Sequence, residues 1–316
     1  MILVTGATGF VGGALVRRLA ADPSFNGVVA AVRRKADALP EGVAQVLVGD
    51  LLPVTDWRTA LKGVDAVVHC AARVHVMHDD ATEPLQAYRE VNVSGTLNLA
   101  RQAADAGVRR FVFVSSIKVN GEATQSGHAF TADDVPEPLD PYGVSKLEAE
   151  QGLRELELQT GMEVVIVRPP LVYGPGAKAN FASMMRWVAR GIPLPLGAIQ
   201  NARSMVAMDN LVDLLATCVK HPAAAGQTFL VSDGEDVSTT ELLRRTAQAM
   251  GKKAFLLPVP AIVLVCGATL LGKRAAAQRL CGSLQLDIVK TKQLLGWTPP
   301  VSVDEGLRGA AAGFRP

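Results

Sequence analysis

The sequence predicts an α/β protein in which a doubly wound parallel sheet is followed by a smaller C-terminal domain. Two observations predict it. Short apolar runs rich in Val and Ile alternate with helical patterns through the first half of the chain, and the first run leads directly into a glycine-rich loop and a helix. Alternating strands and helices form right-handed crossovers, which place the strands parallel in one sheet with helices on its faces.

The expected strands have continuous rather than alternating apolar residues, which is typical of strands covered on both faces. They span residues 2–5, 27–32, 44–50, 66–71, 109–116 and 162–169. Helical patterns lie between them at 12–22, 57–63, 83–107 and 142–161. Gly107 and Gly161 follow two of these patterns at positions that suit helix C-caps.

The alternation ends after Pro169. Residues 170–204 are rich in Pro, Gly and Asn, which is typical of loops that carry specificity. Beyond them we expect a helix at 208–222, a strand at 227–233 and a helix at 238–251, where Ser238 and Glu241 have capping-box spacing. We therefore place a first domain at residues 1–170 and a smaller one at 171–316, with 205–232 as a segment that can return to the first.

The composition excludes several classes of protein. The chain has 316 residues, 49% of them hydrophobic and 5% aromatic, and its 32 basic and 30 acidic side chains give a formal net charge of +2. A nucleic-acid-binding protein needs a basic face and stacking aromatics, so none is expected. Cys70, Cys218, Cys266 and Cys281 form no C-x-x-C pair, which indicates reduced thiols in a cytoplasmic protein. The apolar N-terminus lacks a basic region and contains several glycines, unlike a signal peptide.

Residues 255–272 form an uncharged apolar stretch near the C-terminus. Two prolines and two glycines interrupt it. About a dozen helical residues remain, whereas a membrane span needs about 20. A buried or interface helix is the main expectation. Weak contact with a membrane surface is the alternative, because Lys273 and Arg274 follow directly.

The glycine-rich loop predicts a Rossmann-type dinucleotide site. The strand at 2–5 leads into a G-x-x-G-x-x-G loop at residues 6–12 and then a helix. Glycines permit a tight turn and close approach to a pyrophosphate, and the helix N-terminus supplies free N–H groups. The spacing differs from the commoner G-x-G-x-x-G, and an ordinary strand–helix turn is the alternative. The expected cofactor contacts are Gly6, Gly9, Phe10, Val11 and Gly12.

The end of the second strand bears on the choice of cofactor. An NAD site usually has an acidic residue there, whereas this chain continues with Arg33, Arg34 and Lys35. A guanidinium suits a 2′-phosphate, so the sequence favours NADP(H) over the alternative, NAD(H). Asp50 and Leu51 follow the third strand, where they are expected near the adenine.

Tyr142 and Lys146 are spaced to share one face of a helix. A free tyrosine has a pKa near 10 and is a poor base at neutral pH. A neighbouring ammonium stabilises the phenolate, so we expect Lys146 to lower the pKa of Tyr142 and make it a proton shuttle. Ser115 and Ser116 end the strand one crossover earlier, and Ser116 is placed to hold the substrate oxygen that Tyr142 protonates.

Together these motifs resemble the extended short-chain dehydrogenase/reductase family, in particular its nucleotide-sugar branch, the NAD-dependent epimerase/dehydratase family. The resemblance covers essentially the whole chain. It is carried by TGATGFVG (5–12), GDL (49–51), HCAA (69–72), NVSGT (92–96), VSSIKVNG (114–121), YGVSK (142–146), RPPLVYGPG (168–176), RSMVAMDN (203–210) and LLGWTP (294–299).

The resemblance implies that Ser116, Tyr142 and Lys146 form the catalytic triad, with Lys146 also holding the nicotinamide ribose. It implies that Asn92 steadies the lysine. Residues 1–170 then form the NAD(P)-binding domain and 171–316 the substrate-binding domain. Further cofactor contacts are implied at Ala71, Ala72, Asn92, Ser115, Tyr142, Lys146 and Pro169.

A UDP-sugar bound between the domains is the substrate that the resemblance implies. Asn180 matches a position at the diphosphate–sugar end, and Arg203 matches an arginine that holds the diphosphate, a task that suits a guanidinium. Arg279 is our choice, over Arg274, for a second arginine. The family often forms homodimers through paired helices, for which 83–107 and 142–161 are the candidates.

Departures from the family pattern bear on the reaction. Dehydratases of this branch place an Asp-Glu pair after the catalytic hydroxyl, whereas residues 117–119 contain no carboxylate, so dehydration is not expected. Epimerases usually read V-Y-G where this chain has Val119-Asn120-Gly121. Residues 115–122 and 194–214 look most like UDP-hexose 4-epimerase-like proteins, some of which are 4-keto reductases that form UDP-N-acetylquinovosamine for surface polysaccharide.

Three functions follow as hypotheses. The favoured one is reduction of a UDP-4-keto-6-deoxy-N-acetylhexosamine at C4. The second is a UDP-sugar 4-epimerase of the UDP-glucose or UDP-GlcNAc type, which regenerates a tightly held NAD. The third is a non-catalytic dinucleotide sensor on the same fold. The complete set of Ser116, Tyr142 and Lys146 argues against the sensor, which needs no activated phenol.

Other polar residues are expected to have no catalytic part. His75, His78, Asp79 and Asp80 resemble a metal-ligand cluster, but hydride transfer needs no metal, so we expect a solvated loop and no metal site. His69, within a predicted strand, is expected to be a packed structural residue. Glu148 and Glu150 are expected on an exposed helix face.

Overall fold

The computed structural model describes residues 1–314 except 38, 75–82, 126, 178, 271 and 273; the side chains of 179, 180 and 274–276 are also outside the description. A seven-stranded, wholly parallel sheet forms the larger part, in the order β3-β2-β1-β4-β5-β6-β9. This confirms the predicted doubly wound parallel sheet. Its strands are β1 (Ile2–Thr5), β2 (Val28–Val32), β3 (Ala44–Leu47), β4 (Ala66–His69), β5 (Arg110–Val114), β6 (Glu163–Arg168) and β9 (Thr228–Leu230).

Side chains that alternate along each strand face the two sides of the sheet. Ile2 and Val4 of β1 join one apolar cluster, whereas Leu3 joins another on the opposite face. Strands β1, β2 and β4 are buried along their whole length. The expectation of a buried strand at 44–50 was wrong, because β3 lies at the edge of the sheet and is mostly exposed.

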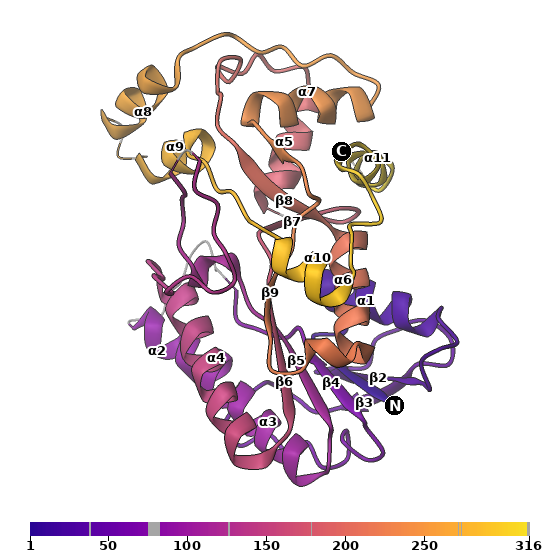
Figure 1. The fold of residues 1–316 in the computed structure, drawn as a ribbon. Coiled ribbons are helices and arrows are strands. Elements are labelled where there is room, and N and C mark those ends of the chain that lie inside the picture. Colours follow the sequence, from indigo (N-terminus) through magenta and orange to yellow (C-terminus); the bar gives the residue numbers. More distant parts are fainter. Residues whose placement is uncertain are drawn as a thin grey trace.

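Helices cover both faces (Figure 1). α1 (Phe10–Ala20) and α6 (Met208–Lys220) pack together on one face through Leu15, Leu19 and Leu211. On the other face, α3 (Thr96–Asp105) and α4 (Pro141–Thr160) contribute Leu99 and Leu153. α6 and β9 thus bring residues from the second half of the sequence onto the first sheet.

Two expected helices differ from the structure. Residues 84–105 form one helical stretch, but α2 (Pro84–Tyr88) and α3 are joined by a seven-residue π-helical segment, η1 (Arg89–Gly95). The helix expected at 57–63 is a series of turns. The run ends at Gly63, whose φ of +66° is a left-handed conformation that a helix cannot continue through. Its buried Trp57 and Leu61 account for the apolar pattern.

A three-stranded sheet, β10 (Asp236–Val237), β8 (Arg203–Ala207) and β7 (Leu171–Tyr173), forms the centre of the smaller part. Around it lie α5 (Ala179–Ala189), α7 (Thr239–Ala249), α8 (Ala261–Leu270), α9 (Arg274–Cys281) and α11 (Val303–Ala312), while α10 (Val289–Leu295) packs beside β9 (Figure 1). Ser238 caps α7 by accepting a hydrogen bond from Glu241 N, as the spacing predicts. No helix in the described residues has the length and apolar character of a membrane span.

Candidate active site

Two glycines of the loop between β1 and α1 leave no room for a side chain at their positions. Gly6 has a φ of +64°, and a Cβ there would lie 2.9 Å from Ala71 N. A Cβ on Gly12 would lie 2.2 Å from the carbonyl oxygen of Gly6. α1 begins after Gly9 with no side-chain cap and no acidic residue in its first turn. Its first N–H groups therefore fit a dinucleotide pyrophosphate, as the motif predicts.

Two predicted cofactor residues come together where β2 and β3 end. Arg33 Nη1, after β2, lies 3.4 Å from Asp50 Oδ1, after β3, and both side chains are mostly exposed. Leu51 lies deeper, where its carbonyl and side chain would touch a Cβ on Gly95. The carboxylate beside Arg33 offsets part of the positive charge on which the predicted preference for a 2′-phosphate rests.

Tyr142 and Lys146 lie in the first two turns of α4. Asp140 caps this helix by accepting a hydrogen bond from Gly143 N at 2.7 Å. Lys146 is buried, and its Nζ donates to the carbonyl oxygen of Val114 at 2.9 Å. It also lies 4.4 Å from the centre of the Phe113 ring and 6.0 Å from that of Tyr142. The helix thus brings the phenol and the ammonium together at the end of β5.

Burial decides the proton affinities of this pair. It lowers the pKa of Lys146 to about 8. It also raises the pKa of Tyr142, and the carboxylate of Asp140 adds to the rise. The shift is therefore opposite to the lowered pKa that the sequence analysis expected for Tyr142, because burial disfavours the charged phenolate.

The two serines after β5 point to different surroundings. Ser116 is half-buried and caps a short 3-10 helix, η2 (Ile117–Val119), by accepting from Lys118 N at 3.3 Å. Ser115 is buried; its hydroxyl donates to Glu150 and its N–H donates to the carbonyl of Val167. The hydroxyl of Ser115, expected at the cofactor, is thus engaged inside the fold. The carbonyl of Pro169 accepts from Ile117 N and holds the turn that carries Ser116.

Asn92 supports α4 from the π-helical segment. It is buried; its Oδ1 accepts from Arg73 N at 2.8 Å, and its Nδ2 donates to Ser145 Oγ at 3.0 Å. Ser145 in turn donates to the carbonyl of Tyr142 at 2.8 Å. The link from Asn92 to Tyr142 therefore runs through Ser145, a residue that the sequence analysis missed although it lies inside the YGVSK motif.

A buried ion pair behind the serines was also missed. Arg168, at the end of β6, contacts both carboxylate oxygens of Glu150 on α4. Its Nη1 donates to Asn120 Oδ1 at 3.0 Å. The expectation that Glu150 lies on an exposed helix face was wrong, since it is 3% exposed. The signal that could have found it is the four-residue step from Lys146, which places Glu150 on the same inward face.

The predicted substrate residues come together only in part. Arg203, at the start of β8, donates from Nη1 to the carbonyl oxygens of Arg279 at 3.0 Å and Gly282 at 2.9 Å. Burial lowers its pKa. Arg279 thus meets Arg203 through its backbone, while its side chain is exposed. The side chains of Asn180 and Arg274 lie outside the description, as does the cluster of His75, His78, Asp79 and Asp80.

Comparison with known proteins agrees with this geometry. Residues 2–232 match the NAD dependent epimerase/dehydratase family. The chain belongs to this family. It is 52% identical to a UDP-glucose 4-epimerase of Vibrio cholerae, over 99% of this chain and 95% of that protein. It is 28% identical to the N-acetyl-alpha-D-glucosaminyl-diphospho-ditrans,octacis-undecaprenol 4-epimerase of Escherichia coli O157:H7, over 97% and 92%.

A solved structure agrees with the fold. The UDP-glucuronic acid 4-epimerase from Bacillus cereus, in complex with NAD, superposes with a TM-score of 0.78 at 22% identity, covering 99% of this chain and 97% of that one. Family membership confirms the predicted resemblance and makes the chain an enzyme of the NAD-dependent nucleotide-sugar type. The sensor hypothesis is thereby set aside.

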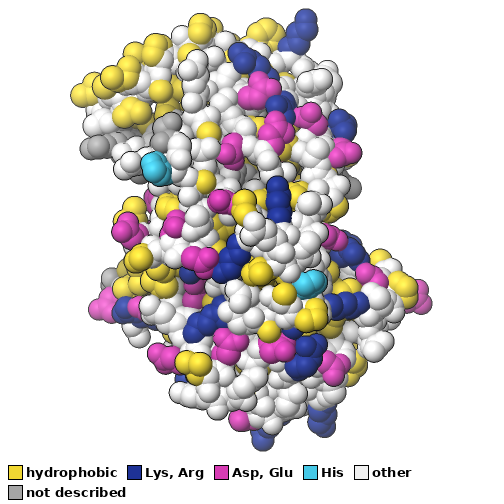
Figure 2. Space-filling view, in the orientation of Figure 1, with side chains coloured by type: hydrophobic (Ala, Val, Ile, Leu, Met, Phe, Trp, Pro, Cys, Tyr) yellow, Lys and Arg dark blue, Asp and Glu magenta, His cyan; other side chains and the backbone are white. Residues whose placement is uncertain are grey.

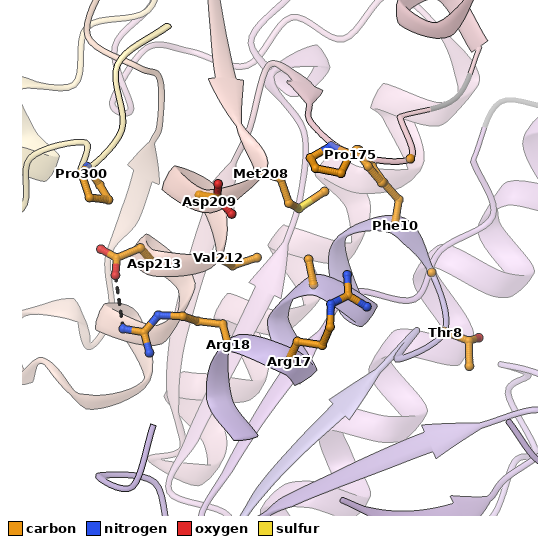
Figure 3. Close-up of a pocket in the computed structure, with 13 residues that line it drawn as sticks. Thr8, Phe10, Arg17, Arg18, Pro175, Met208, Asp209, Val212, Asp213 and Pro300 are labelled. Atoms are coloured by element: carbon orange, nitrogen blue, oxygen red, sulfur yellow. Dashed lines mark hydrogen bonds and ion pairs between the residues drawn. The ribbon is translucent and has the colours of Figure 1, made fainter. Parts of the chain in front are cut away.

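A cavity of about 780 Å³ adjoins the outer side of the family's phosphate loop. It lies between α1 and α6, and Arg18 of α1 reaches across to Asp213 of α6 (Figure 3). Thr8, Gly9 and Phe10 line it, but Tyr142 and Lys146 do not.

Within the described residues, no group of His, Cys, Asp or Glu is placed to hold a metal ion. His69 is packed as predicted, between Thr5 Oγ1 at 2.7 Å and Thr96 Oγ1 at 3.0 Å.

Proposed function

We propose that the protein interconverts the C4 epimers of a UDP-hexose or UDP-N-acetylhexosamine with NAD held by the glycine loop. The observation that carries the proposal is the placement of Tyr142 near the buried Lys146, whose Nζ donates to Val114 at the end of β5. Ser116 follows in the turn after β5, at the edge of the sheet where the loop also lies. The 52% identity to an epimerase supports it. The division into an NAD-binding part, 1–170, and a substrate-binding part, 171–316, with 205–232 returning to the first part, belongs to the same proposal.

The residues have distinct parts in this chemistry. Bound NAD+ would supply the hydride acceptor and, through its positive ring, a field that favours a phenolate at Tyr142. Tyr142 takes the proton of the sugar 4-hydroxyl as C4 becomes a ketone and returns it as the alcohol forms again. Ser116 donates a hydrogen bond to the same sugar oxygen. Lys146, held by the carbonyl of Val114, keeps a positive charge beside the phenol and would bind the ribose of the nicotinamide.

Asn120 bears on the choice between epimerase and reductase. The V-N-G sequence departs from the usual V-Y-G of epimerases, which favoured a reductase in the sequence analysis. In the structure Asn120 is buried, donates to the carbonyl of Thr131 and accepts from Arg168. The side chain serves the fold, so the departure does not argue against epimerisation. Reduction of a UDP-4-keto-6-deoxy-N-acetylhexosamine for surface polysaccharide remains the second candidate, because it uses the same three residues.

Product analysis separates the two. The enzyme is incubated with UDP-glucose, UDP-GlcNAc or a UDP-4-keto-6-deoxy-N-acetylhexosamine, with and without NAD(P)H, and products are identified by NMR. Because the relative from Escherichia coli acts on a lipid-linked sugar diphosphate, a polyprenyl-diphosphate sugar is added to the panel. Epimerisation without net consumption of nicotinamide supports the proposal. Consumption of one reduced nicotinamide per product, with no epimerised sugar, would establish the reductase instead.

We further propose that Arg33 determines the affinity for NADP(H) relative to that for NAD(H). The change Arg33→Ala should weaken NADP+ binding about tenfold or more, because it removes the guanidinium from a 2′-phosphate. NAD+ binding should change little. Isothermal titration with both nucleotides measures this, with Arg58→Ala as the control, since Arg58 is also exposed and also pairs with an aspartate, Asp56. Equal losses of affinity for both nucleotides would show that Arg33 does not distinguish NADP(H) from NAD(H).

The proposal extends to substrate binding and to location. Arg203 would bind the diphosphate of the UDP-sugar, with Asn180 and Arg279 as further candidates for contact with the substrate. A cytoplasmic enzyme is supported by four cysteines, Cys70, Cys218, Cys266 and Cys281, that are all free.

A further inference from the structure

α8 presents an uncharged apolar surface on the outside of the smaller domain. None of its ten residues is buried. Ile262 and Leu270 are 72% and 88% exposed. Together with Cys266 they follow at intervals of four, so they share the outward face of the helix. Ala261 and Leu264 lie on the inward face and pack against the core of the domain.

Neighbouring segments extend this surface. Residues 252–257 run beside 189–197, where Leu194 N donates to the carbonyl of Phe255 and Leu257 N donates to that of Leu194, each at 2.8 Å. We use the term apolar lobe for the exposed large side chains gathered here: Trp187, Ile192, Phe255, Leu257, Ile262, Val263 and Leu270. Figure 2 shows hydrophobic side chains over α8 at the upper left, with no acidic side chain among them.

The two segments that form the apolar lobe carry charges of one sign. Residues 164–208 and 242–286 contain no Asp or Glu, although the whole chain has 30. The same two segments contain twelve basic residues. Three of them are paired with acidic residues from outside the segments: Arg168 with Glu150, Arg244 with Glu241, and Arg245 with Glu235 and Glu241. Arg186, Arg190 and Lys253 are exposed. Lys252 Nζ donates to the carbonyl of Ala189, which brings the basic residues of the two segments together.

We propose that the apolar lobe docks on the surface of a bilayer that contains anionic phospholipids. Apolar side chains that enter the headgroup region, surrounded by lysine and arginine, match such a surface in both hydrophobicity and charge. The helix is too short to span, so it lies in the interface. A second copy of this chain is a poorer occupant, because it would bring two basic rims together. The inference does not depend on the proposed reaction.

Docking would place the bilayer beside the substrate end of the enzyme. α8 packs on α9, and the carbonyl oxygens of Arg279 and Gly282, at the end of α9, hold Arg203. The surface that meets the membrane is therefore continuous with the segment that supports the proposed diphosphate site.

Vesicle sedimentation of the full chain tests the proposal. Wild type should sediment with phosphatidylcholine vesicles that contain phosphatidylglycerol, and less with phosphatidylcholine alone. The double variant Ile262→Ser/Leu270→Ser should lower the partition coefficient about tenfold or more, because two large side chains no longer enter the interface. The matched control is Val54→Ser/Val135→Ser, two side chains that are 86% and 80% exposed elsewhere. It should bind as wild type does.

The basic rim is tested by Arg190→Gln/Lys253→Gln, which should reduce binding to the anionic vesicles alone. Its control is Lys62→Gln/Lys292→Gln, two exposed lysines outside the lobe. Thermal unfolding of every variant shows that it is folded.

Fluorescence gives a second measurement. Of the three tryptophans, Trp57 and Trp297 are buried at 2% and 5% exposure, whereas Trp187 is 40% exposed in the lobe. Anionic vesicles should shift its emission to the blue, and Trp187→Phe should remove the shift. Absence of wild-type binding, or equal loss in the control variants, would overturn the proposal. So would lobe-dependent self-association or capture of an acidic protein without vesicle binding.

Discussion

At the residue scale, burial of the Lys146 ammonium opposes folding stability. The ammonium is buried, and its Nζ donates a hydrogen bond to a neutral group, the carbonyl oxygen of Val114. Desolvation is the main reason that its pKa falls to about 8, from an ordinary value of 10.5. Between these pH values the unfolded chain binds a proton that the folded chain does not, so this residue makes stability rise with pH.

The change Lys146→Met should remove this contribution. Without nucleotide, the unfolding free energy of wild type relative to the variant should increase by about 2 kcal/mol from pH 7 to pH 9.5, since a shift of one pKa unit corresponds to about 1.4 kcal/mol. Urea unfolding at both pH values measures the difference. Lys62→Met, at an exposed lysine, is the control and should show no such change. A constant difference between wild type and Lys146→Met would contradict the pKa assignment.

Tyr142→Phe should abolish turnover and leave nucleotide binding nearly intact. The change removes only the phenol oxygen that exchanges a proton with the sugar. Steady-state assays and nucleotide titration measure the two effects. Tyr88 faces the Tyr142 ring edge-on with ring centres 6.1 Å apart, so Tyr88→Phe is a matched control that should retain activity. Turnover in Tyr142→Phe comparable to wild type would refute the mechanism.

At the element scale, side-chain contacts hold the first half of α4, residues 141–150, at its beginning and at its end. Asp140 caps its first turn, and Asn92 reaches it through Ser145. One turn beyond Lys146, Glu150 binds Arg168 at the end of β6. The π-helical segment places Asn92 in this position, in keeping with the frequent occurrence of such segments at functional sites. The helix is therefore held against the strands whose ends carry Ser116 and Pro169.

Glu150→Gln should lower the unfolding free energy by about 3 kcal/mol, because it leaves the buried guanidinium of Arg168 without a charged partner. Glu148→Gln, on the same helix, breaks the more exposed pair with Arg89 and should cost about 1 kcal/mol or less. Chemical denaturation of both variants provides the comparison. Equal losses of unfolding free energy in the two variants would mean that burial of the Glu150–Arg168 pair does not add to its effect on stability.

At the scale of the whole molecule, the chain returns to its first sheet after building much of the second. α6 packs on α1, and β9 adds the seventh strand beside β6 with Ile166 opposite Thr228. The face covered by α2, α3 and α4 is the one through which we predict a homodimer. Leu158 of α4 is 88% exposed there.

Light scattering should give twice the mass of the chain. Leu158→Glu should weaken the dimer about tenfold or more, because symmetry places the buried charge twice in one interface. Val54→Glu, at another exposed apolar residue, should leave the mass unchanged. A monomeric wild type would contradict the prediction.

Local sequence was sufficient for the glycine loop, the parallel strands and the YGVSK pair. Each of these depends on residues within a few positions of one another: Gly12 must be glycine because it meets Gly6, and Tyr142 and Lys146 share a helix face. Side-chain burial was not predictable in the same way. Glu150 was expected to be exposed and Ser115 to face the cofactor. In the structure the carboxylate of Glu150 pairs with Arg168, and the hydroxyl of Ser115 donates to the same carboxylate.

The sequence by itself determined the fold class and the family, and it was sufficient to propose Ser116, Tyr142 and Lys146 as the catalytic trio. Only the tertiary structure decided the direction of the Tyr142 pKa, the structural part of Asn120 and the exposure of α8. These properties depend on which segments distant in sequence surround a group, and therefore on its desolvation and its partners. Residues 255–272 illustrate the difference: their apolar composition was plain from the sequence, but only the packed domain leaves their outer face uncovered.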